Sequence, residues 1–364
     1  MKISENRPTI KDVARVSGVS LATVSRVINN AEMVSPELRT QVEAAIEQLG
    51  YEHRRARPVV AVDGSPAELA MTGLMGGLST DIELLPMLMP DIINPYFTQI
   101  AQGVQIESAE NERLFPFLVN TTHDVRRQRW VKDSLLHLPI TGLIVCGNDL
   151  RAEEWISFAD RASYPIVFLN NRVDHPRATS ILVNFEDAAS RATMHLLSLN
   201  HTRIGYMTDN NNSEHSQARQ KGIENVLARR GLRPIIEQMP GNLPHQDGVN
   251  QVIGRFMQLP PCERPTAIII YNDYLALFAL NAIRSYGLHV PQDISIVGFD
   301  NIPTASHANP PLTTIDVPKT RMGRMAYQML IQLRKQEIMG GGFTLVDTVL
   351  MVRESSGPAP SEAG

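Results

Sequence analysis

Cysteine, aromatic side chains and long apolar runs are all scarce in this chain of 364 residues. Its two cysteines, Cys146 and Cys262, lie far apart and have no Cys or His neighbour at metal-ligand spacing, so they predict neither a disulfide framework nor a zinc site. No apolar run approaches the roughly 20 residues that span a bilayer, and the first residues lack the apolar core of a signal peptide. We therefore expect reduced thiols, no membrane contact and a cytoplasmic location.

Net charge is also small, because 34 Lys and Arg residues against 38 Asp and Glu residues give a formal charge of −4. A chain that bound polyanions with its whole surface would be strongly basic, so any contact with nucleic acid must come from a local patch. The run His53-Arg54-Arg55-Ala56-Arg57 is such a patch. The length predicts two or three domains, and ordinary apolar content with few aromatics is typical of an α/β protein.

Catalytic motifs are missing as well. The sequence contains no nucleophile elbow, no Walker loop and no His-Glu-x-x-His zinc helix. Its ten histidines are scattered, and we expect His195 and His201 to be surface residues. The sequence thus predicts no enzyme, no catalytic residue, no metal site and no cofactor.

The stretch from Thr9 to Asn29 reads as two short helices joined by a tight turn. Thr9 is placed to cap the first helix, Gly18 to end it and Ser20 to cap the second. Apolar residues line one face of each helix, whereas the second helix presents small, hydroxyl-bearing and basic groups on its other face: Leu21, Ala22, Thr23, Ser25, Arg26 and Asn29. Ser35-Pro36 starts a third helix that ends at Gly50. Capping alone leaves two interpretations, a plain helical hairpin or a helix-turn-helix that enters the major groove of DNA.

The full sequence from Thr9 to Asn29 decides between these two interpretations, because it resembles the lactose-repressor (LacI/GalR) family. That family opens with T-I-x-D-V-A and continues with G-V-S-x-x-T-V-S-R-V-x-N, and every position is matched between Thr9 and Asn29. The resemblance implies a DNA-binding headpiece over residues 1–50, with Leu21–Asn29 as its recognition helix. The residues expected to contact DNA are Thr9, Ser20, Leu21, Ala22, Thr23, Ser25, Arg26 and Asn29.

Residues 51–83 are expected to form a hinge and linker. The resembled family has Y-x-P-N and then an Ala-Arg pair and a leucine here, but this chain has His53-Arg54 and a proline at position 58. Arg54, Arg55 and Arg57 fit contacts to phosphates or a narrow minor groove. A solvated basic linker fits them equally well. The linker is longer than the family normally has, and we have no functional account of the extra residues.

Residues 84–354 alternate between strand-like apolar runs and helical patterns, which predicts parallel sheets covered by helices. The expected strands are 84–89, 114–119, 142–146, 166–169, 203–207, 267–271 and 295–299, and the expected helices are 96–111, 126–136, 153–161, 185–199, 216–230, 248–258 and 274–286. The fold class is therefore α/β, and the resemblance implies a periplasmic-binding-protein-like core of two doubly wound subdomains behind a three-helix headpiece. It also implies that Thr313–Ile315 and a helix over 320–335 return to the first half. Residues 355–364 are expected to be a flexible tail.

Polar side chains follow several of the expected strands, where ligands bind in open α/β sheets. The family's phrases P-D-x-x-N-P-F/Y-F, N-D-x-x-A and G-F/Y-D-N recur here at 90–97, 272–276 and 298–301. The residues expected to bind an effector are Asp91, Asn94, Tyr96, Phe97, Asn170, Arg219, Asn272 and Asp300; the resemblance implies the roles of Arg219, Asn272 and the aspartates, because the matching residues bind effector hydroxyls in the family's sugar-binding members. Asn170 stands where many members have aspartate, and Leu243 stands where several have a stacking aromatic. These departures leave the effector's identity open, and they also allow a degenerate pocket.

These observations predict a DNA-binding transcriptional repressor that acts as a homodimer on a pseudo-palindromic operator. The candidate pocket mixes donors and acceptors with few stacking faces, so we expect its effector to be a sugar or, because of Arg219, a sugar acid. The alternative is a regulator with a degenerate pocket, controlled by a protein partner or bound constitutively. A sugar-transport protein would need a signal peptide and no headpiece, and both features contradict it.

Overall fold

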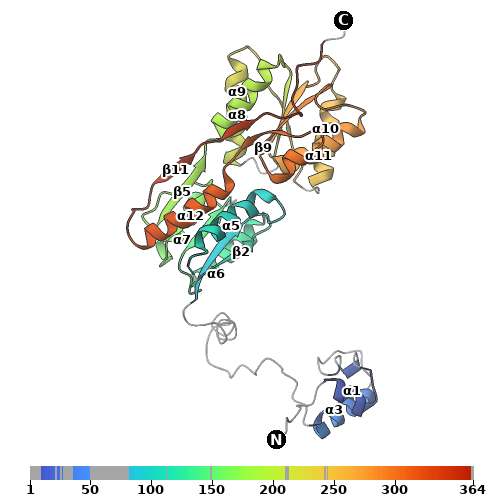
Figure 1. Cartoon of the computed structure of the whole chain (residues 1–364), viewed down its shortest axis with the longest axis vertical. Helices are drawn as coiled ribbons and strands as arrows, with labels where there is room; N and C mark the ends of the chain where they lie inside the picture. The colour runs from blue at the N-terminus through green and yellow to red at the C-terminus, as the bar shows by residue number, and fades with distance from the viewer. Residues whose placement is uncertain are drawn as a thin grey trace. The chain divides into compact units, whose positions relative to one another are not determined.

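The computed structural model describes residues 10–20, 23, 24, 27, 36–49, 82–111, 113–147, 150–209, 213–241, 243 and 245–361. The chain divides into two units, residues 1–78 and 79–364, which are treated separately below (Figure 1). No described helix is long and apolar enough to cross a membrane.

The first unit contains helices α1 (Ile10–Ser17) and α3 (Pro36–Leu49). Gly18 follows α1 with a φ of 68°, a backbone conformation that glycine adopts at low cost. The Oγ of Ser20 accepts a hydrogen bond from the backbone N–H of Thr23 at 3.2 Å, so the predicted cap of the second helix is confirmed. The small core is apolar and consists of Val13, Val24, Val27, Val42 and Ala45.

Several predicted DNA contacts lie outside the described residues. They are Thr9, Leu21, Ala22, Ser25, Arg26, Asn29, Arg54, Arg55 and Arg57. The linker up to residue 81 and the last residues, 362–364, also lie outside.

The second unit contains two sheets, each built from six strands of the described chain. The first sheet has the order β11-β5-β4-β3-β1-β2, and all its pairs are parallel. Its strands are β1 (Glu83–Met89), β2 (Leu114–Asn120), β3 (Leu143–Cys146), β4 (Ile166–Leu169), β5 (Ala178–Val183) and β11 (Phe343–Val346).

The second sheet has the order β12-β10-β9-β8-β6-β7. Its strands are β6 (Ile204–Thr208), β7 (Ile235–Gln238), β8 (Ala267–Ile270), β9 (Ser295–Asp300), β10 (Thr313–Asp316) and β12 (Val349–Met351). Only the β10–β12 pair is antiparallel among the described strands of this sheet. The predicted α/β class with two mainly parallel sheets is therefore confirmed.

Helices cover both faces of each sheet (Figure 1). On the first sheet, α5 (Pro95–Ser108) and α12 (Lys319–Arg334) share one apolar core, while α6 (Val125–Leu135) and α7 (Ala152–Arg161) share the other. On the second sheet, α8 (Phe185–Ser198) pairs with α9 (Glu214–Ala228), and α10 (His245–Gln258) pairs with α11 (Asp273–Ser285). A short 3₁₀ helix, η1 (Pro303–His307), follows β9.

The packing of α5 against α12 depends on two glycines. A Cβ at Gly103 would collide with the carbonyl oxygen of Thr320, and a Cβ at Gly323 would collide with the carbonyl oxygen of Ile100. Because both positions lack a side chain, the two helix backbones approach closely. This contact attaches α12 to the first sheet, although α12 follows β10 of the second sheet in the sequence.

The expectation that residues 313–315 return to the first half is wrong. These residues form β10, which pairs in parallel with β9 in the second sheet, with Thr313 opposite Val297 and Ile315 opposite Phe299. The predicted return of the next helix is correct, since α12 packs on α5. The crossover therefore occurs between β10 and α12.

Four strands were not predicted: β5, β7, β11 and β12. Three of them, β7, β11 and β12, are short strands at the edges of the sheets and have exposed side chains. β5 lies between β4 and β11 and is largely buried, but its Ile-Leu-Val end was not assigned to a strand from the sequence.

The start of the predicted flexible tail is packed instead. Ser355 is fully buried; its Oγ donates to the carbonyl of Ile296 at 2.7 Å and accepts from the N–H of Thr313 at 2.8 Å. His201 lies nearby and is also fully buried, so its predicted surface location is wrong. Its Nε2 lies 3.0 Å from the carbonyl oxygen of Gly357. These hydrogen bonds hold the segment after residue 354 against β9 and β10.

Candidate functional site

A cavity of about 540 Å³ lies where the carboxyl ends of strands from both sheets meet. All eight residues that the sequence predicts for an effector site line it: Asp91, Asn94, Tyr96, Phe97, Asn170, Arg219, Asn272 and Asp300. They come from segments spread over some 200 positions of the chain, and only the two sheets bring them together.

The first wall of the cavity is the loop after β1 and the first turn of α5. Asn94 caps the helix, since its Oδ1 accepts from the N–H of Tyr96 at 3.0 Å, and Pro95 occupies the first helical position. Asp91 accepts from the N–H of Ile93 at 2.7 Å, which shapes the loop. The rings of Tyr96 and Phe97 meet edge to face with centroids 5.1 Å apart. These local contacts fix four of the predicted residues on one side.

Asn170 connects the two halves at the end of β4. Its φ of 66° turns the chain away from the strand, and its Nδ2 donates to the Tyr96 hydroxyl at 2.6 Å. Its backbone carbonyl accepts from Nε2 of His215, which belongs to α9 of the second half. The Oδ1 of Asn170 is buried with no hydrogen-bond partner. A bound ligand that donates a hydrogen bond would satisfy this oxygen.

Arg219 lines the cavity and is only 3% exposed. Its guanidinium carbon lies 4.0 Å from the ring centroid of Phe185, 4.4 Å from that of Tyr271 and 4.8 Å from that of Phe299. Such contacts between a cation and aromatic faces stabilise a desolvated guanidinium. Nη1 donates to the His215 carbonyl at 3.2 Å, whereas the buried Nε has no hydrogen-bond partner. Arg219 therefore offers a rigid, unused donor to a ligand.

Asp300 faces the cavity from the end of β9 and is buried. Burial raises the pKa of its carboxyl to about 7, against the opposing effect of the positive charges of Arg219 and Lys319. Its backbone has a φ of 107°, which L-residues rarely adopt. Near neutral pH this group is therefore able to accept a hydrogen bond as a carboxylate or to donate one as an acid.

Lys319 holds the Asp300 loop through hydrogen bonds to its backbone, and this residue was not predicted from the sequence. Its buried ammonium donates to the carbonyls of Val317 at 2.9 Å, of Asn301 at 3.2 Å and of Asp300. Burial lowers the pKa of Lys319, and the neighbouring aspartates, Asp300 first, oppose that effect. Lys319 is the first residue of α12, so the loop that carries Asp300 is joined directly to the helix that returns to the first half.

The pair Asn272-Asp273 has divided roles. Asn272 lines the cavity and caps α11, because its Oδ1 accepts from the N–H of Leu275 at 2.9 Å. Asp273 instead points into the core, where it accepts from the Thr314 hydroxyl at 2.6 Å and from the N–H of Ile302 at 3.0 Å. Burial raises the pKa of Asp273 well above its usual range. Asp273 is thus a structural residue that links α11 to β10.

Sequence reasoning missed several lining residues, notably Asp209, Phe185, Tyr271, Tyr274 and His245. Asp209 directly follows β6, so the same strand-end reasoning that selected the others would have found it. With Asp209 included, the described lining carries three carboxylates against one guanidinium. Leu243 lines the cavity as well, in place of an aromatic side chain.

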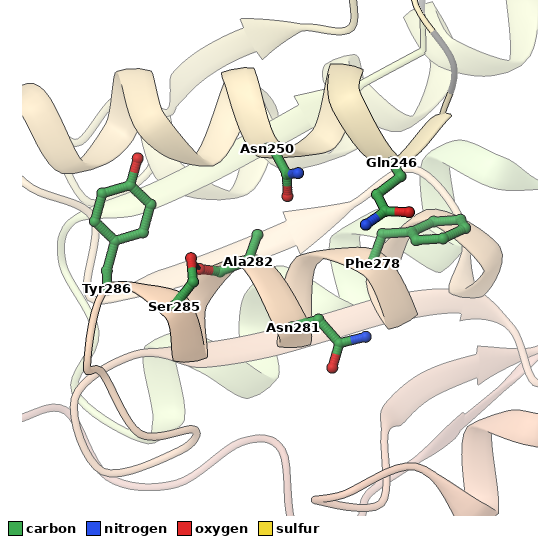
Figure 2. A pocket seen from close by; sticks show the side chains of 7 residues that line it. All are labelled: Gln246, Asn250, Phe278, Asn281, Ala282, Ser285 and Tyr286. Atoms are coloured by element: carbon green, nitrogen blue, oxygen red, sulfur yellow. Dashed lines mark hydrogen bonds between the residues drawn. The ribbon is translucent and has the colours of Figure 1, made fainter.

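A separate hollow lies between α10 and α11, on the outer side of the second sheet (Figure 2). Figure 2 shows Gln246 and Asn250 on one helix and Phe278 and Asn281 on the other. Its described lining is neutral and shares no residue with the cavity between the halves. Among the described residues, no group of His, Cys, Asp and Glu side chains could hold a metal ion.

Two family models match the chain. Residues 9–53 match the bacterial regulatory proteins of the lacI family, and residues 193–356 match the periplasmic binding protein-like domain. The HTH-type transcriptional repressor PurR of Aliivibrio fischeri is 30% identical over 329 residues, which cover 90% of this chain and 92% of the relative. The ribose operon repressor of Haemophilus influenzae is 30% identical over 352 residues, 95% and 98% of the two chains. The structure of the Lac repressor dimer bound to operator and the anti-inducer ONPF matches with a TM-score of 0.65, 26% identity and coverage of 97% and 100%.

Proposed function

Because the chain belongs to the lacI family of bacterial regulatory proteins, we propose that it is a DNA-binding transcriptional repressor controlled by a small ligand. The ligand is a sugar or a sugar acid, and it binds in the cavity between the two sheets. The observation that carries this proposal is the buried Arg219, whose Nε has no hydrogen-bond partner in the described part of the chain and which lines, together with Asp300, a cavity bordered by both halves of the unit.

The chemistry of the cavity favours a polyhydroxylated ligand. A hydroxyl group donates one hydrogen bond and accepts others, so it suits a cavity whose lining includes the donor Arg219, the acceptor Asn170 Oδ1 and the Asp300 carboxyl. Three aspartates favour groups that donate, which hydroxyls do. Arg219 is the one guanidinium in the described lining, so a carboxylate on the ligand would bind there.

A planar base fits the described lining less well. Arg219 covers one face each of Phe185, Tyr271 and Phe299. The rings of Tyr274 and His245 pack edge to face at 5.4 Å, and Leu243 supplies no ring. These contacts leave few aromatic faces on which a purine could stack.

Ligand binding would control operator affinity by selecting one angle between the two halves. The ligand contacts α5 and β4 on one side and α9, α11 and β9 on the other, so it favours the arrangement in which both sets reach it. The change in DNA affinity equals the difference in ligand affinity between the two arrangements. We further propose a homodimer on a pseudo-palindromic operator, since one recognition helix reads only a few base pairs.

The effector is tested by a thermal-shift screen with sugars, sugar acids, nucleosides and amino acids. We expect one sugar or sugar acid to raise the melting temperature of wild type, and Arg219→Ala to abolish that response. Arg230→Ala, at an exposed position near the end of α9, is the matched control and should keep it. If nucleosides alone stabilise the protein, or if Arg219→Ala keeps the full sugar response, the ligand assignment is wrong. If no compound binds while operator binding persists, the result supports the alternative of a regulator whose pocket is degenerate.

The DNA-binding role is tested with Arg26→Ala. We propose that Leu21 and Ala22 contact thymine methyls or read shape, while Arg26 donates to a guanine edge. The substitution should cost about 1–3 kcal/mol of operator binding and relax the preference at one base pair. Equal loss on every sequence would make Arg26 a phosphate contact, and footprinting of a single half-site would contradict the dimer.

A further inference from the structure

A second cavity, of about 430 Å³, lies beside the first, near the end of β4. It is lined by His123, Val125, Leu150, Arg151, Ala152, Trp155, Asn171, Arg172, Val173, Ser213, Glu214 and His215. Asn170 lines the first cavity and His215 lines the second, and the hydrogen bond from His215 Nε2 to the Asn170 carbonyl joins their walls.

The two cavities carry opposite charge. The described lining of the first has Asp91, Asp209 and Asp300 against Arg219. The described lining of the second has Arg151 and Arg172 against Glu214. A small anion is therefore attracted more strongly by the second cavity than by the first, where three aspartates oppose the one guanidinium.

The two arginines are available for binding. Neither forms an ion pair with a carboxylate in the described part of the chain. The Arg172 guanidinium carbon lies 4.5 Å from the ring centroid of Phe343, a contact that restricts the side chain. Guanidinium groups donate two parallel hydrogen bonds to phosphate oxygens, and a fixed guanidinium loses little entropy when it does so.

The backbone adds to the positive potential of the second cavity. Val125, Ala152 and Glu214 are lining residues and are also the first residues of α6, α7 and α9. The amino ends of helices carry partial positive charge. The ends of α6 and α9 are capped by side chains, whereas Arg151, the cap residue of α7, provides no side-chain cap.

We propose that this second cavity binds a tetrahedral oxyanion through Arg151 and Arg172, either as free inorganic phosphate or as the phosphoryl group of a sugar phosphate. The proposal does not depend on which ligand fills the first cavity. Because His215 joins the two walls, an anion bound here would also change the position of Asn170 and thereby the affinity of the first cavity.

Trp155 provides a direct readout because it lines the second cavity and the chain has only one other tryptophan, Trp130, which is exposed on α6. In a Trp130→Phe background, inorganic phosphate, glucose 6-phosphate and glucose are titrated against Trp155 fluorescence at constant ionic strength. We expect a saturable response to phosphate. Arg151→Gln and Arg172→Gln should each weaken it roughly tenfold or more, because each removes charge-assisted hydrogen bonds.

The control variant is Arg230→Gln, which removes an exposed arginine near the end of α9 and should leave the titration unchanged. Arg151→Gln changes an exposed residue without a cap bond, so it should keep the wild-type melting temperature. Asp300→Asn should leave phosphate binding intact even where it abolishes binding in the first cavity, so the two proposals fail independently. Tighter binding of glucose 6-phosphate than of phosphate and glucose identifies the phosphoryl group of a larger ligand as the source. No saturable response to either anion, or equal loss in Arg230→Gln and Arg151→Gln, would overturn the proposal.

Discussion

Asp300 combines an unusual backbone with a buried carboxyl group. Its φ is 107°, and the following residue, Asn301, has a φ of 54°. Lys319 binds the carbonyls of both residues and so holds this pair in a conformation that the chain would otherwise avoid. Asp300 therefore lines the cavity with its side chain, while Lys319 holds the loop that carries it.

The first prediction concerns the pH dependence of stability. An unfolded aspartate has a pKa of about 3.9, whereas burial raises the pKa of Asp300 to about 7 in the folded protein. Between these values the folded state holds a proton that the unfolded chain releases, so the free energy of unfolding falls as pH rises. Asp300→Asn should remove part of this fall, by a few kcal/mol, in urea titrations from pH 4 to 7.5. The substitution also removes the Asp300 charge, which helps to raise the pKa of Asp273. Losing that effect reduces the fall of the unfolding free energy with pH further.

The matched control is Asp133→Asn, since the Asp133 side chain is 59% exposed and pairs with Arg161 at the surface. Its pH profile should follow that of wild type. Parallel profiles for wild type and Asp300→Asn would contradict the raised pKa.

The second prediction concerns Lys319→Met. This change keeps the apolar stem but removes the ammonium, so the buried carbonyls of Asp300, Asn301 and Val317 lose their donor. We expect the free energy of unfolding to fall by roughly 1–3 kcal/mol, the usual result of unpairing buried acceptors. Denaturant titration measures it, with Lys335→Met at an exposed position as control. Unchanged stability would mean that the desolvation of the ammonium cancels its hydrogen bonds.

At the scale of elements, the contact between α5 and α12 joins the first half to the segment of chain that leaves the second half. Gly103 and Gly323 allow the two backbones to touch, and Asn94, Tyr96 and Phe97 at the start of α5 line the cavity. Because Lys319 begins α12, this helix joins the Asp300 loop to the opposite wall. A shift of α12 along α5 would therefore move residues on both walls of the cavity.

The third prediction tests this contact with Gly323→Ala. The new methyl group collides with the backbone carbonyl of Ile100, which no side-chain rotation can relieve. We expect a loss of roughly 1–3 kcal/mol in the free energy of unfolding, as for other overpacked contacts. Gly342→Ala is the control, because a Cβ there meets nothing within 4 Å. Equal stability of the two variants would show that the helices separate freely.

The fourth prediction concerns the segment after β12. A chain that ends at Glu354 loses the hydrogen bonds of Ser355 to Ile296 and Thr313 and the contact of Gly357 with His201. It should be less stable by at least about 2 kcal/mol, since several buried polar groups lose their partners. A chain that ends at Pro360 keeps them and should match the full chain in a thermal melt. If both truncations melt alike, the packed segment contributes nothing to stability.

Considered as a whole, the second unit has two halves whose strands interleave along the sequence. The chain passes from β5 to α8, returns between β10 and α12, and crosses again between β11 and β12. Connections of this kind limit the halves to opening and closing around the cavity that they share. A ligand that touches both halves therefore changes the angle between them.

The fifth prediction concerns operator binding by the full chain. The net charge of −4 leaves DNA binding to local basic groups, so affinity should depend strongly on salt. If a dimer neutralises six to ten phosphates, the operator affinity should fall by roughly 10³–10⁵-fold between 50 and 200 mM salt. Fluorescence anisotropy with operator DNA measures the slope, and Arg55→Gln should reduce it if that residue contacts a phosphate. An unchanged slope would support the solvated-linker interpretation of residues 54–57.

The sequence by itself determined the family, the α/β class, the cap at Ser20 and the identity of the eight cavity residues. The cap and most of the cavity residues depend on local rules, because caps, turn residues and strand ends are set by neighbours in the chain, whereas the family and Arg219 depend on the resemblance of the sequence. The same rules would have found Asp209. All the predicted DNA contacts, those of Ser20 and Thr23 included, remain predictions, and so does the role of the long linker.

Only the tertiary structure decided which half each late segment joins, and which polar residues are buried. Residues 313–315 read as a strand in either sheet, and pairing with β9 settles the matter. Ser355 and His201 look like surface residues in isolation, yet both are fully buried, and their hydrogen-bond partners lie far away in the sequence: Ile296 and Thr313 for Ser355, and Gly357 for His201. Lys319 and the aromatic cage of Arg219 escaped prediction for the same reason. Their partners are distant in sequence, and burial, which sets their energetics, is a property of the assembled fold.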